Sequence, residues 1–155
     1  MSNYGKSFEV KFKQDWLKSF PNSFLLRLND QVSGYKFTSV NICDFIGFTD
    51  GKLYLLECKS HGGASVPFDV ISQYDKLKRY SGMKDIRAGV VVWLYEKDKC
   101  FYVPVKTITK LMNENQKSVG IRHIGTEDII EIPSVKKRVF MDSDYSILTE
   151  LPEGW

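Results

Sequence analysis

The sequence predicts an α/β (α+β) fold in which helices flank a mixed central sheet. Two observations lead to this prediction. Apolar side chains recur at helical spacing in three segments, and four other segments have the apolar and β-branched character of strands. These segments follow one another in the order helix, strand, strand, helix, strand, strand, helix. Elements in this order can pack as layers around one core, which favours a single domain.

The composition agrees with one globular domain over residues 1–155. Of the 155 residues, 43% are hydrophobic and 14% are aromatic, which suffices for a continuous core. No apolar run approaches the roughly 18 residues that span a bilayer, and the start at Met1 lacks the pattern of a secretion signal. The three cysteines form no CxxC or Cys/His spacing, so we expect neither a disulfide framework nor structural zinc. These features predict a soluble, cytoplasmic protein without a membrane partner.

The charge distribution leaves the partner open. A formal net charge of +3 fits a nucleic-acid partner, but it also describes many proteins that never contact DNA. Basic residues gather near the start, in the middle and late in the chain, and each such cluster can equally be a solvated face. Charge alone therefore does not choose a function.

The first predicted helix spans Tyr4–Phe20. Large aromatic side chains recur there every four residues, with polar residues between them: Phe8, Phe12, Trp16 and Phe20. Pro21 ends this helix, because proline cannot continue it. Residues 22–40 are mixed in character and predict a short irregular stretch that leads into a strand.

A hairpin follows the mixed stretch. Asn41–Gly47 is strand-like, and Thr49–Gly51 supplies turn residues before a second strand at Lys52–Lys59. A loop at Ser60–Pro67 then leads to a second helix, predicted at Phe68–Met83 from its apolar spacing.

The next predicted strand, Ala88–Tyr95, is apolar almost throughout, as expected of a strand covered on both faces. A polar turn at Glu96–Lys99 joins it to a returning strand at Phe101–Val105. A short helix is predicted at Thr107–Asn115. Beyond it we predict no further element, and no repeat or linker marks a second domain.

Charged residues end one face of the Lys52–Lys59 strand. Alternate side chains share a face, so Glu57 and Lys59 continue a face that begins with Leu53 and Leu55. Exposure at a strand end, or an ion pair between the two, would explain them without any function. Alternatively, the strand end opens into a cleft. Asp44 lies thirteen residues before Glu57, and a tight hairpin would place the two carboxylates opposite each other.

Two carboxylates and one lysine suit metal-assisted hydrolysis of a phosphodiester. Magnesium prefers oxygen ligands and keeps several waters. It can polarise the phosphate and activate water, while Lys59 orients that water or stabilises negative charge on phosphorus. We therefore expect Mg²⁺, with Mn²⁺ as an alternative. The spacing D-x₁₂-E-x-K is by itself unspecific, because many charged strands contain it.

Four segments resemble a known family. CDFIGFTDGKLYLLECKS resembles the D-x-x-G…E-x-K core of PD-(D/E)XK nucleases, whose fold is restriction-endonuclease-like. Three further segments resemble, in order and spacing, segments of the RecU family of Holliday-junction resolvases: GKSFE, PFDVISQYDKLKRY and FYVP. The resemblance covers a core at about residues 5–111 and leaves a C-terminal extension at about 112–155.

The resemblance implies roles for five residues. Asp44 and Glu57 would be metal ligands, Lys59 the catalytic lysine, Glu9 a further carboxylate ligand on the first helix, and Gln73 an accessory active-site residue. From the sequence alone, Glu9 can equally be an exposed acid beside the apolar stripe, and Gln73 a solvent-facing helix position.

The chain also departs from the family. Cys43 replaces the proline that gives the nuclease class its name, which should not impair metal binding. Typical RecU proteins carry a projecting stalk before the Asp-bearing strand, whereas only residues 22–40 are available here. Selectivity for four-way junctions is therefore less firmly implied than nuclease activity.

Other candidate residues have ordinary explanations. His61 could contact phosphate or be a plain loop residue, and His123 has no spaced partner. Gly62 and Gly63 form no nucleotide-binding signature, so we expect no nucleotide cofactor. The aromatic residues at 93–102 could stack on bases, but their apolar setting favours a core or a subunit interface.

Three functions remain open at this stage. The first is a homodimeric, magnesium-dependent endonuclease that cuts four-way DNA junctions. The second is a restriction-like or repair nuclease that acts on duplex, flapped or single-stranded DNA. The third is a DNA-binding protein without hydrolytic activity.

Overall fold

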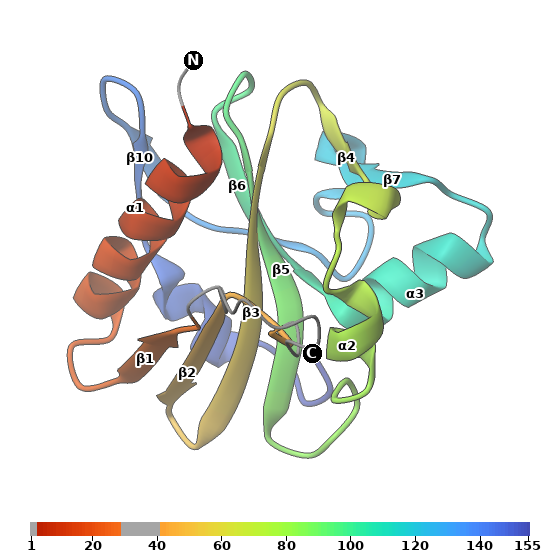
Figure 1. The fold of residues 1–155 in the computed structure, drawn as a ribbon, viewed down its shortest axis with the longest axis horizontal. Helices are drawn as coiled ribbons and strands as arrows, with labels where there is room; N and C mark the ends of the chain where they lie inside the picture. Colours follow the sequence, from red (N-terminus) through yellow and green to blue (C-terminus); the bar gives the residue numbers. More distant parts are fainter. Residues whose placement is uncertain (1–2, 29–40) are drawn as a thin grey trace, which may run out of the picture.

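The computed structural model describes residues 3–28 and 41–155, which form one central sheet with a layer on each face (Figure 1). Six strands make up this sheet in the order β1-β2-β3-β5-β6-β8. Their bounds are β1 Phe24–Arg27, β2 Phe45–Thr49, β3 Lys52–His61, β5 Ile86–Leu94, β6 Lys99–Pro104 and β8 Ile130–Glu131. The central pair β3 and β5 is parallel and the neighbouring pairs are antiparallel. The predicted fold class, a mixed sheet flanked by helices, is confirmed.

The two faces of the sheet are covered by different parts of the chain. Helix α1 (Tyr4–Ser19) covers one face together with β9 (Ser134–Lys136), β10 (Met141–Ser143) and the 3₁₀ helix η3 (Tyr145–Glu150). Helices α2 (Tyr74–Lys78) and α3 (Val105–Asn113) cover the other. The second layer also holds β4 (Ser65–Pro67), β7 (Ser118–Gly120) and the short 3₁₀ helices η1 (Phe68–Val70) and η2 (Ile121–His123). We call these the α1 side and the α2 side.

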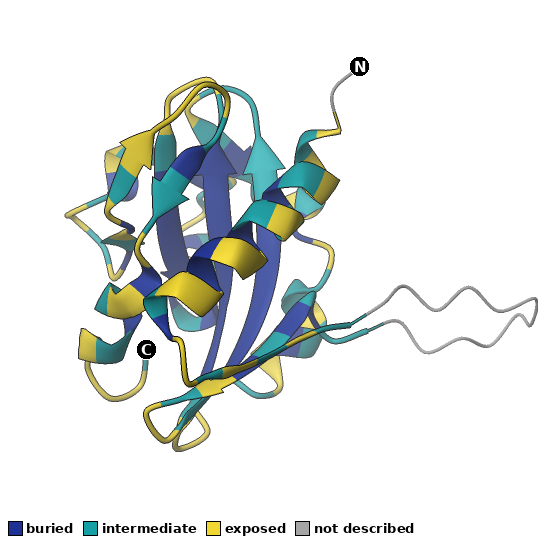
Figure 2. Cartoon of the chain, turned by 90° about the vertical axis from the view of Figure 1, so that its left-hand side faces the viewer, coloured by how far each residue is buried: buried dark blue, intermediate teal, exposed yellow. Residues whose placement is uncertain are grey.

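Helix α1 matches its prediction closely. Its amino end is capped by Asn3, whose side chain accepts a hydrogen bond from the backbone N–H of Lys6 at 3.1 Å. Its aromatic stripe is buried against the sheet; Phe12, for example, contacts Phe45 with ring centroids 5.0 Å apart. Figure 2 shows the resulting contrast between the exposed outer side of α1 and the buried strands behind it.

The prediction of one helix at Phe68–Met83 was wrong. A single 3₁₀ turn at Phe68–Val70 comes first, and α2 then lasts only five residues. Phe68 and Ile71 are anchored in the cluster over β5 and β6, whereas Leu77 belongs to a separate cluster around Leu55. One straight helix would have to serve both clusters, so tertiary packing overrides the helical spacing.

The first predicted hairpin strand was displaced. It spans Phe45–Thr49 and not Asn41–Gly47, because the turn at Asp50 and Gly51 is two residues long and the strand runs up to it. The mixed stretch contains a strand at Phe24–Arg27, whereas the strand expected towards residue 40 falls outside the described residues. The predicted loop at Ser60–Pro67 contains all of β4, and its first two residues belong to β3.

The region beyond residue 115, where no element was predicted, is ordered around short strands and 3₁₀ turns. Its strands are two or three residues long; β7 pairs with the distant β4, and β9 pairs with the following β10. Segments this short show no periodicity, so only the pairing itself reveals them.

The last part of the C-terminal extension, from β9 onward, packs on the α1 side. Tyr145, Leu148 and Leu151 are buried in the same cluster as the aromatic stripe of α1. Buried Asp15 on α1 accepts a hydrogen bond from the backbone N–H of Ser143 at 3.0 Å. The extension therefore completes the core. Within the described residues, none of the helices has the length and apolar character needed to cross a bilayer.

We predict that Leu148→Ala lowers the free energy of unfolding by roughly 2 to 5 kcal/mol, because it empties a fully buried position. Urea unfolding followed by circular dichroism measures this change. Leu17→Ala is the control, since Leu17 on α1 is 41% exposed and should change stability by no more than about 0.5 kcal/mol. Equal small effects in both variants would show that the extension is not part of the core.

Candidate active site

Strand β3 carries two of the candidate residues on its α2 side. Tyr54, Leu56 and Cys58 pack into the α1-side cluster, while Leu55 packs with Leu77 of α2 on the opposite face. Glu57 and Lys59 alternate with the first set and therefore face the α2 side. Both continue an otherwise apolar face, as the sequence predicted.

Asp44 lies directly before β2 and against β3. Phe45 pairs with Leu56, and the same register places Asp44 opposite Glu57. The backbone N–H of Asp44 donates to the carbonyl of Leu56 at 3.0 Å. Its Oδ2 accepts a hydrogen bond from the backbone N–H of Cys58 at 2.9 Å. The structure therefore brings the Asp44 carboxylate to the Glu57–Cys58 peptide, as the predicted hairpin requires.

Glu57 is a buried carboxyl group in a strained electrostatic setting. It is 4% exposed, and its Oε2 has no hydrogen-bond partner within the described structure. The pKa of Glu57 is raised from the ordinary 4.5 to about 7, first by burial and then by the nearby Asp44 charge. Lys59 and a backbone hydrogen bond from Gln73 act in the opposite direction on this pKa. One oxygen of Glu57, Oε2, thus lacks a donor or cation within the described structure.

Lys59 does not neutralise Glu57 by direct contact. No ion pair joins the two side chains, although Lys59 is near enough to lower the pKa of Glu57. Lys59 is half-buried in β3. The explanation of this pair as a structural salt bridge therefore does not hold. The ammonium group of Lys59 is therefore available to form an ion pair with a bound phosphate.

Gln73 lies beside Glu57 rather than in solvent. Its backbone N–H is the group that hydrogen-bonds the Glu57 carboxyl, and it occupies the cap position just before α2. Its side-chain Oε1 is buried without a partner within the described structure. Two buried oxygen acceptors, one from Glu57 and one from Gln73, therefore lack donors in the same neighbourhood.

Glu9 lies on the α1 side and is held by Arg27. Its Oε2 accepts hydrogen bonds from Nε and Nη2 of Arg27 at 3.1 and 2.9 Å. The Glu9 carboxylate is also close enough to raise the pKa of the buried Cys58 thiol, after burial itself and Asp44. Glu9 therefore lies across β3 from Glu57, and its role as a metal ligand stays a prediction.

Arg27 is a site residue that sequence reasoning missed. It lies in β1, which belongs to the mixed stretch, and its guanidinium lies 5.7 Å from the centroid of the Phe45 ring. The only signal in the sequence is a lone arginine in an apolar segment. Its pairing with Glu9 depends on how α1 crosses the sheet, which the sequence does not show.

The donor set suits a hard divalent cation. In the described part of the chain, no three His, Cys, Asp or Glu side chains come together as a metal site. The oxygens available are those of Asp44 and Glu57, with the unpartnered amide oxygen of Gln73 nearby. Magnesium is commonly held by one or two carboxylates and keeps several waters, so this smaller set is sufficient.

The two histidines have structural surroundings. His123 is buried, its Nδ1 accepts a hydrogen bond from the backbone N–H of Gly120 at 3.1 Å, and burial lowers its pKa. His61 Nδ1 lies 2.6 Å from the carbonyl oxygen of Gly62. Trp93 and Tyr102 are buried core residues, which excludes them as a base-stacking surface.

Comparison with known proteins gives one solved structure to report. No protein-family model matches the chain, and no curated protein matches it. The chain is similar to the structure of Hjc, a Holliday junction resolvase from the archaeal hyperthermophile Archaeoglobus fulgidus. The two are 18% identical, the match covers 76% of this chain and 90% of that one, and the TM-score is 0.47. At this identity and TM-score, the likeness assigns no function to the chain.

The raised pKa of Glu57 predicts a stability penalty at neutral pH. The folded protein keeps the proton up to about pH 7, whereas the unfolded chain loses it near 4.5, so stability falls as pH rises between these values. Glu57→Gln removes the ionisation and should stabilise the protein at pH 8 by about 3 kcal/mol. The gain should vanish below pH 4.5.

Urea unfolding in the presence of a chelator, at a series of pH values, measures this effect. Glu150→Gln is the matched control, because Glu150 is exposed and should behave as wild type at every pH. A Glu57→Gln variant that is no more stable than wild type at pH 8 would contradict the buried, unpaired state of this carboxylate.

Proposed function

We propose that this protein is a metal-dependent DNA endonuclease that resolves four-way junctions. The observation that carries the proposal is the position of the Asp44 carboxylate beside buried Glu57, where it accepts a hydrogen bond from the backbone N–H of Cys58 at 2.9 Å. Lys59 lies two residues beyond Glu57 on the same face of β3. The resemblance to RecU resolvases adds the substrate class; with no family model matching, that part stays a prediction.

Asp44 and Glu57 would hold the cation, with Gln73 close by. Mg²⁺ or Mn²⁺ bound there would supply a Lewis acid for the phosphodiester and a source of activated water. Ionised Glu57 has an unsatisfied oxygen and a raised pKa, both of which a cation would correct. The metal site would thus relieve an electrostatic cost that the protein carries without it.

Lys59 would act on the phosphate. Its ammonium forms no ion pair with Glu57, and the half-buried position limits its contact with water. A cation in such a place stabilises the negative charge that grows on phosphorus in the transition state. Glu9 would join as a further ligand only by exchanging its ion pair with Arg27.

A junction-resolving enzyme makes two symmetric cuts, and a dimer with two-fold symmetry supplies two active sites. We therefore propose a homodimer. The segment between α1 and Asp44 is short for a RecU protein, which favours a second candidate, a nuclease that cuts duplex or flapped DNA.

A DNA-binding protein without hydrolysis is the weaker alternative. Such a protein gains nothing from a buried carboxylate next to a second carboxylate, because the pair costs folding free energy. Such a cost is expected where the carboxylates bind a cation.

We predict that Lys59→Ala cuts DNA at least about a hundredfold more slowly while folding and binding DNA as the wild type does. The reason is that Lys59 acts mainly on the transition state. The measurement uses end-labelled four-way junction and matched linear duplex, each with Mg²⁺ and with chelator. Lys97→Ala is the control, since Lys97 is exposed in the turn between β5 and β6.

The substrate pattern decides among the candidates. Paired nicks confined to the junction support a resolvase, and cutting of both substrates supports a general nuclease. Full activity in chelator would refute metal dependence. Absence of cutting on every substrate tested, with intact DNA binding, would leave the non-catalytic protein.

We predict that the protein sediments as a dimer on four-way junction DNA, because one protomer has one Asp44 and Glu57 pair. Sedimentation velocity at several protein concentrations, with and without junction DNA, measures the mass. A monomer that stays monomeric on the junction would contradict the paired-cut mechanism and leave the metal site itself unaffected.

A further inference from the structure

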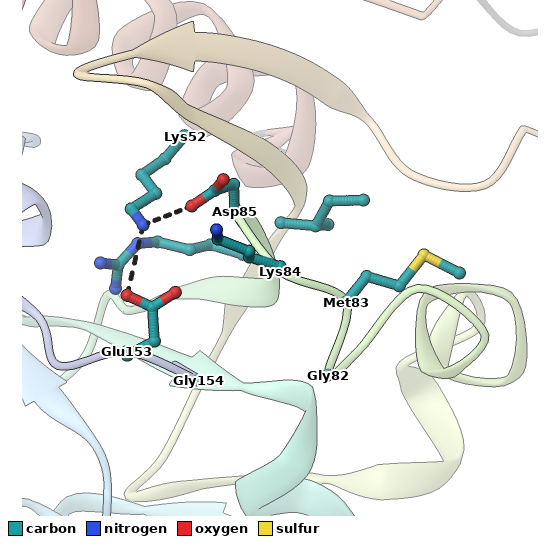
Figure 3. A pocket seen from close by; sticks show the side chains of 9 residues that line it. Lys52, Gly82, Met83, Lys84, Asp85, Glu153 and Gly154 are labelled. Carbon is teal, nitrogen blue, oxygen red and sulfur yellow. Dashed lines mark hydrogen bonds and ion pairs between the residues drawn. The ribbon is translucent and has the colours of Figure 1, made fainter.

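A cavity of about 350 Å³ lies away from the candidate active site, between the first residues of β3 and β5 and the C-terminal segment (Figure 3). Lys52 begins β3 and Arg87 lies at the start of β5; both line the cavity, together with Lys84, Asp85 and Glu153. Lys52 precedes Glu57 by five residues, which is roughly 17 Å along an extended strand. Nothing in the proposed nuclease chemistry uses these charges.

Arg87 is a buried guanidinium without an anionic partner. The residue is 5% exposed, and its Nη2 and Nη1 donate to the carbonyl oxygens of Leu151 and Pro152 at 2.9 and 3.4 Å. No carboxylate in the described part of the chain forms an ion pair with it, and its Nε is buried without an acceptor. Two neutral carbonyls leave a full positive charge uncompensated, which is costly in a protein interior.

The other polar groups near Arg87 do not supply the missing charge. Tyr54 is its register partner on β3, and burial raises the pKa of both Tyr54 and the nearby Tyr102. The positive charge of Arg87 lowers both pKa values less than burial raises them. Both phenols therefore stay neutral.

Taken together, the three cations and two carboxylates that line the cavity leave one positive charge in excess. Lys52 is matched by Asp85 at 2.7 Å and by Glu153 at 3.5 Å. Lys84 is exposed and makes no ion pair or hydrogen bond through its ammonium within the described structure, although it lowers the pKa of Asp85. Figure 3 shows the charged side chains of Lys52, Asp85 and Glu153 gathered at one side of the cavity, with Met83 at the other.

We infer that this cavity binds an oxyanion of the phosphate class, held by Arg87 and Lys84. Arginine offers a planar set of donors that fits phosphate oxygens, and Lys84 adds a mobile cation at the rim. Because Arg87 also holds the carbonyls of Leu151 and Pro152, an anion here would fasten the C-terminal segment to β5.

The phosphate group can come from two sources, free phosphate or the backbone of DNA. Binding of free phosphate is independent of the proposed function, whereas the second source rests on it. Inorganic phosphate and a short DNA duplex are therefore separate arms of one experiment.

Titration of the full chain with inorganic phosphate, followed by amide NMR shifts at constant ionic strength, tests the site. We expect saturable shifts at Gly82, Lys84 and Gly154, and a dissociation constant that rises about threefold to fivefold in Lys84→Ala. Lys84 is chosen because it is exposed and its removal leaves intact the hydrogen bonds from Arg87 to the carbonyls of Leu151 and Pro152. Lys97→Ala, also an exposed lysine, should bind phosphate as wild type does.

Each outcome has a defined meaning. If only the duplex shifts these amides, and less so in Lys84→Ala, the site receives a backbone phosphate of DNA. If neither probe gives saturable shifts there, or if Lys84→Ala and Lys97→Ala behave alike, the inference is overturned. A protein that binds phosphate here but cuts no DNA refutes the nuclease proposal and leaves this site in place.

Discussion

The register of β2 against β3 is the constraint on which the candidate site depends. Side chains alternate along a strand, so a slip of one residue would turn Glu57 and Lys59 away from the α2 side and separate Asp44 from Glu57. The turn at Asp50 and Gly51 fixes this register, because both residues adopt positive φ, at 52° and 72°. Gly51 takes this conformation without strain, and aspartate is among the residues that tolerate it. A two-residue turn thus determines where the carboxylates meet.

Packing then determines the burial and the hydrogen bonding of Glu57. Glu57 is 4% exposed on the face of β3 where Leu55 packs with Leu77. The approach of Gln73 supplies one backbone donor and leaves an oxygen on each side chain without a partner. A continuous helix from Phe68 would not have placed the residue before α2 in this position. The broken helix, which the sequence did not predict, is therefore part of how the site is assembled.

The sequence predicted what is local and periodic. The central strand β3, its two faces and the aromatic stripe of α1 follow from alternation and four-residue spacing. The partner of Glu9 could not be predicted, because Arg27 reaches it only through the crossing of α1 over β1. The short strands after residue 115 and the buried Arg87 depend likewise on contacts between segments far apart in the chain. A lone arginine in an apolar run looks the same whether it is exposed or buried.

The two faces of the sheet have different roles. The C-terminal extension closes the α1 side, where Asp15 and Arg87 bind its backbone and Leu148 fills the core. Cys58 belongs to the same buried cluster as the extension, so the α1-side face of β3 is covered at this point. Chemistry on β3 is then confined to the α2 side and to the edge where Asp44 precedes β2. Glu9 is on the closed side, and the edge near β1 is the route by which its carboxylate could reach a cation shared with Asp44, at the expense of the Arg27 ion pair.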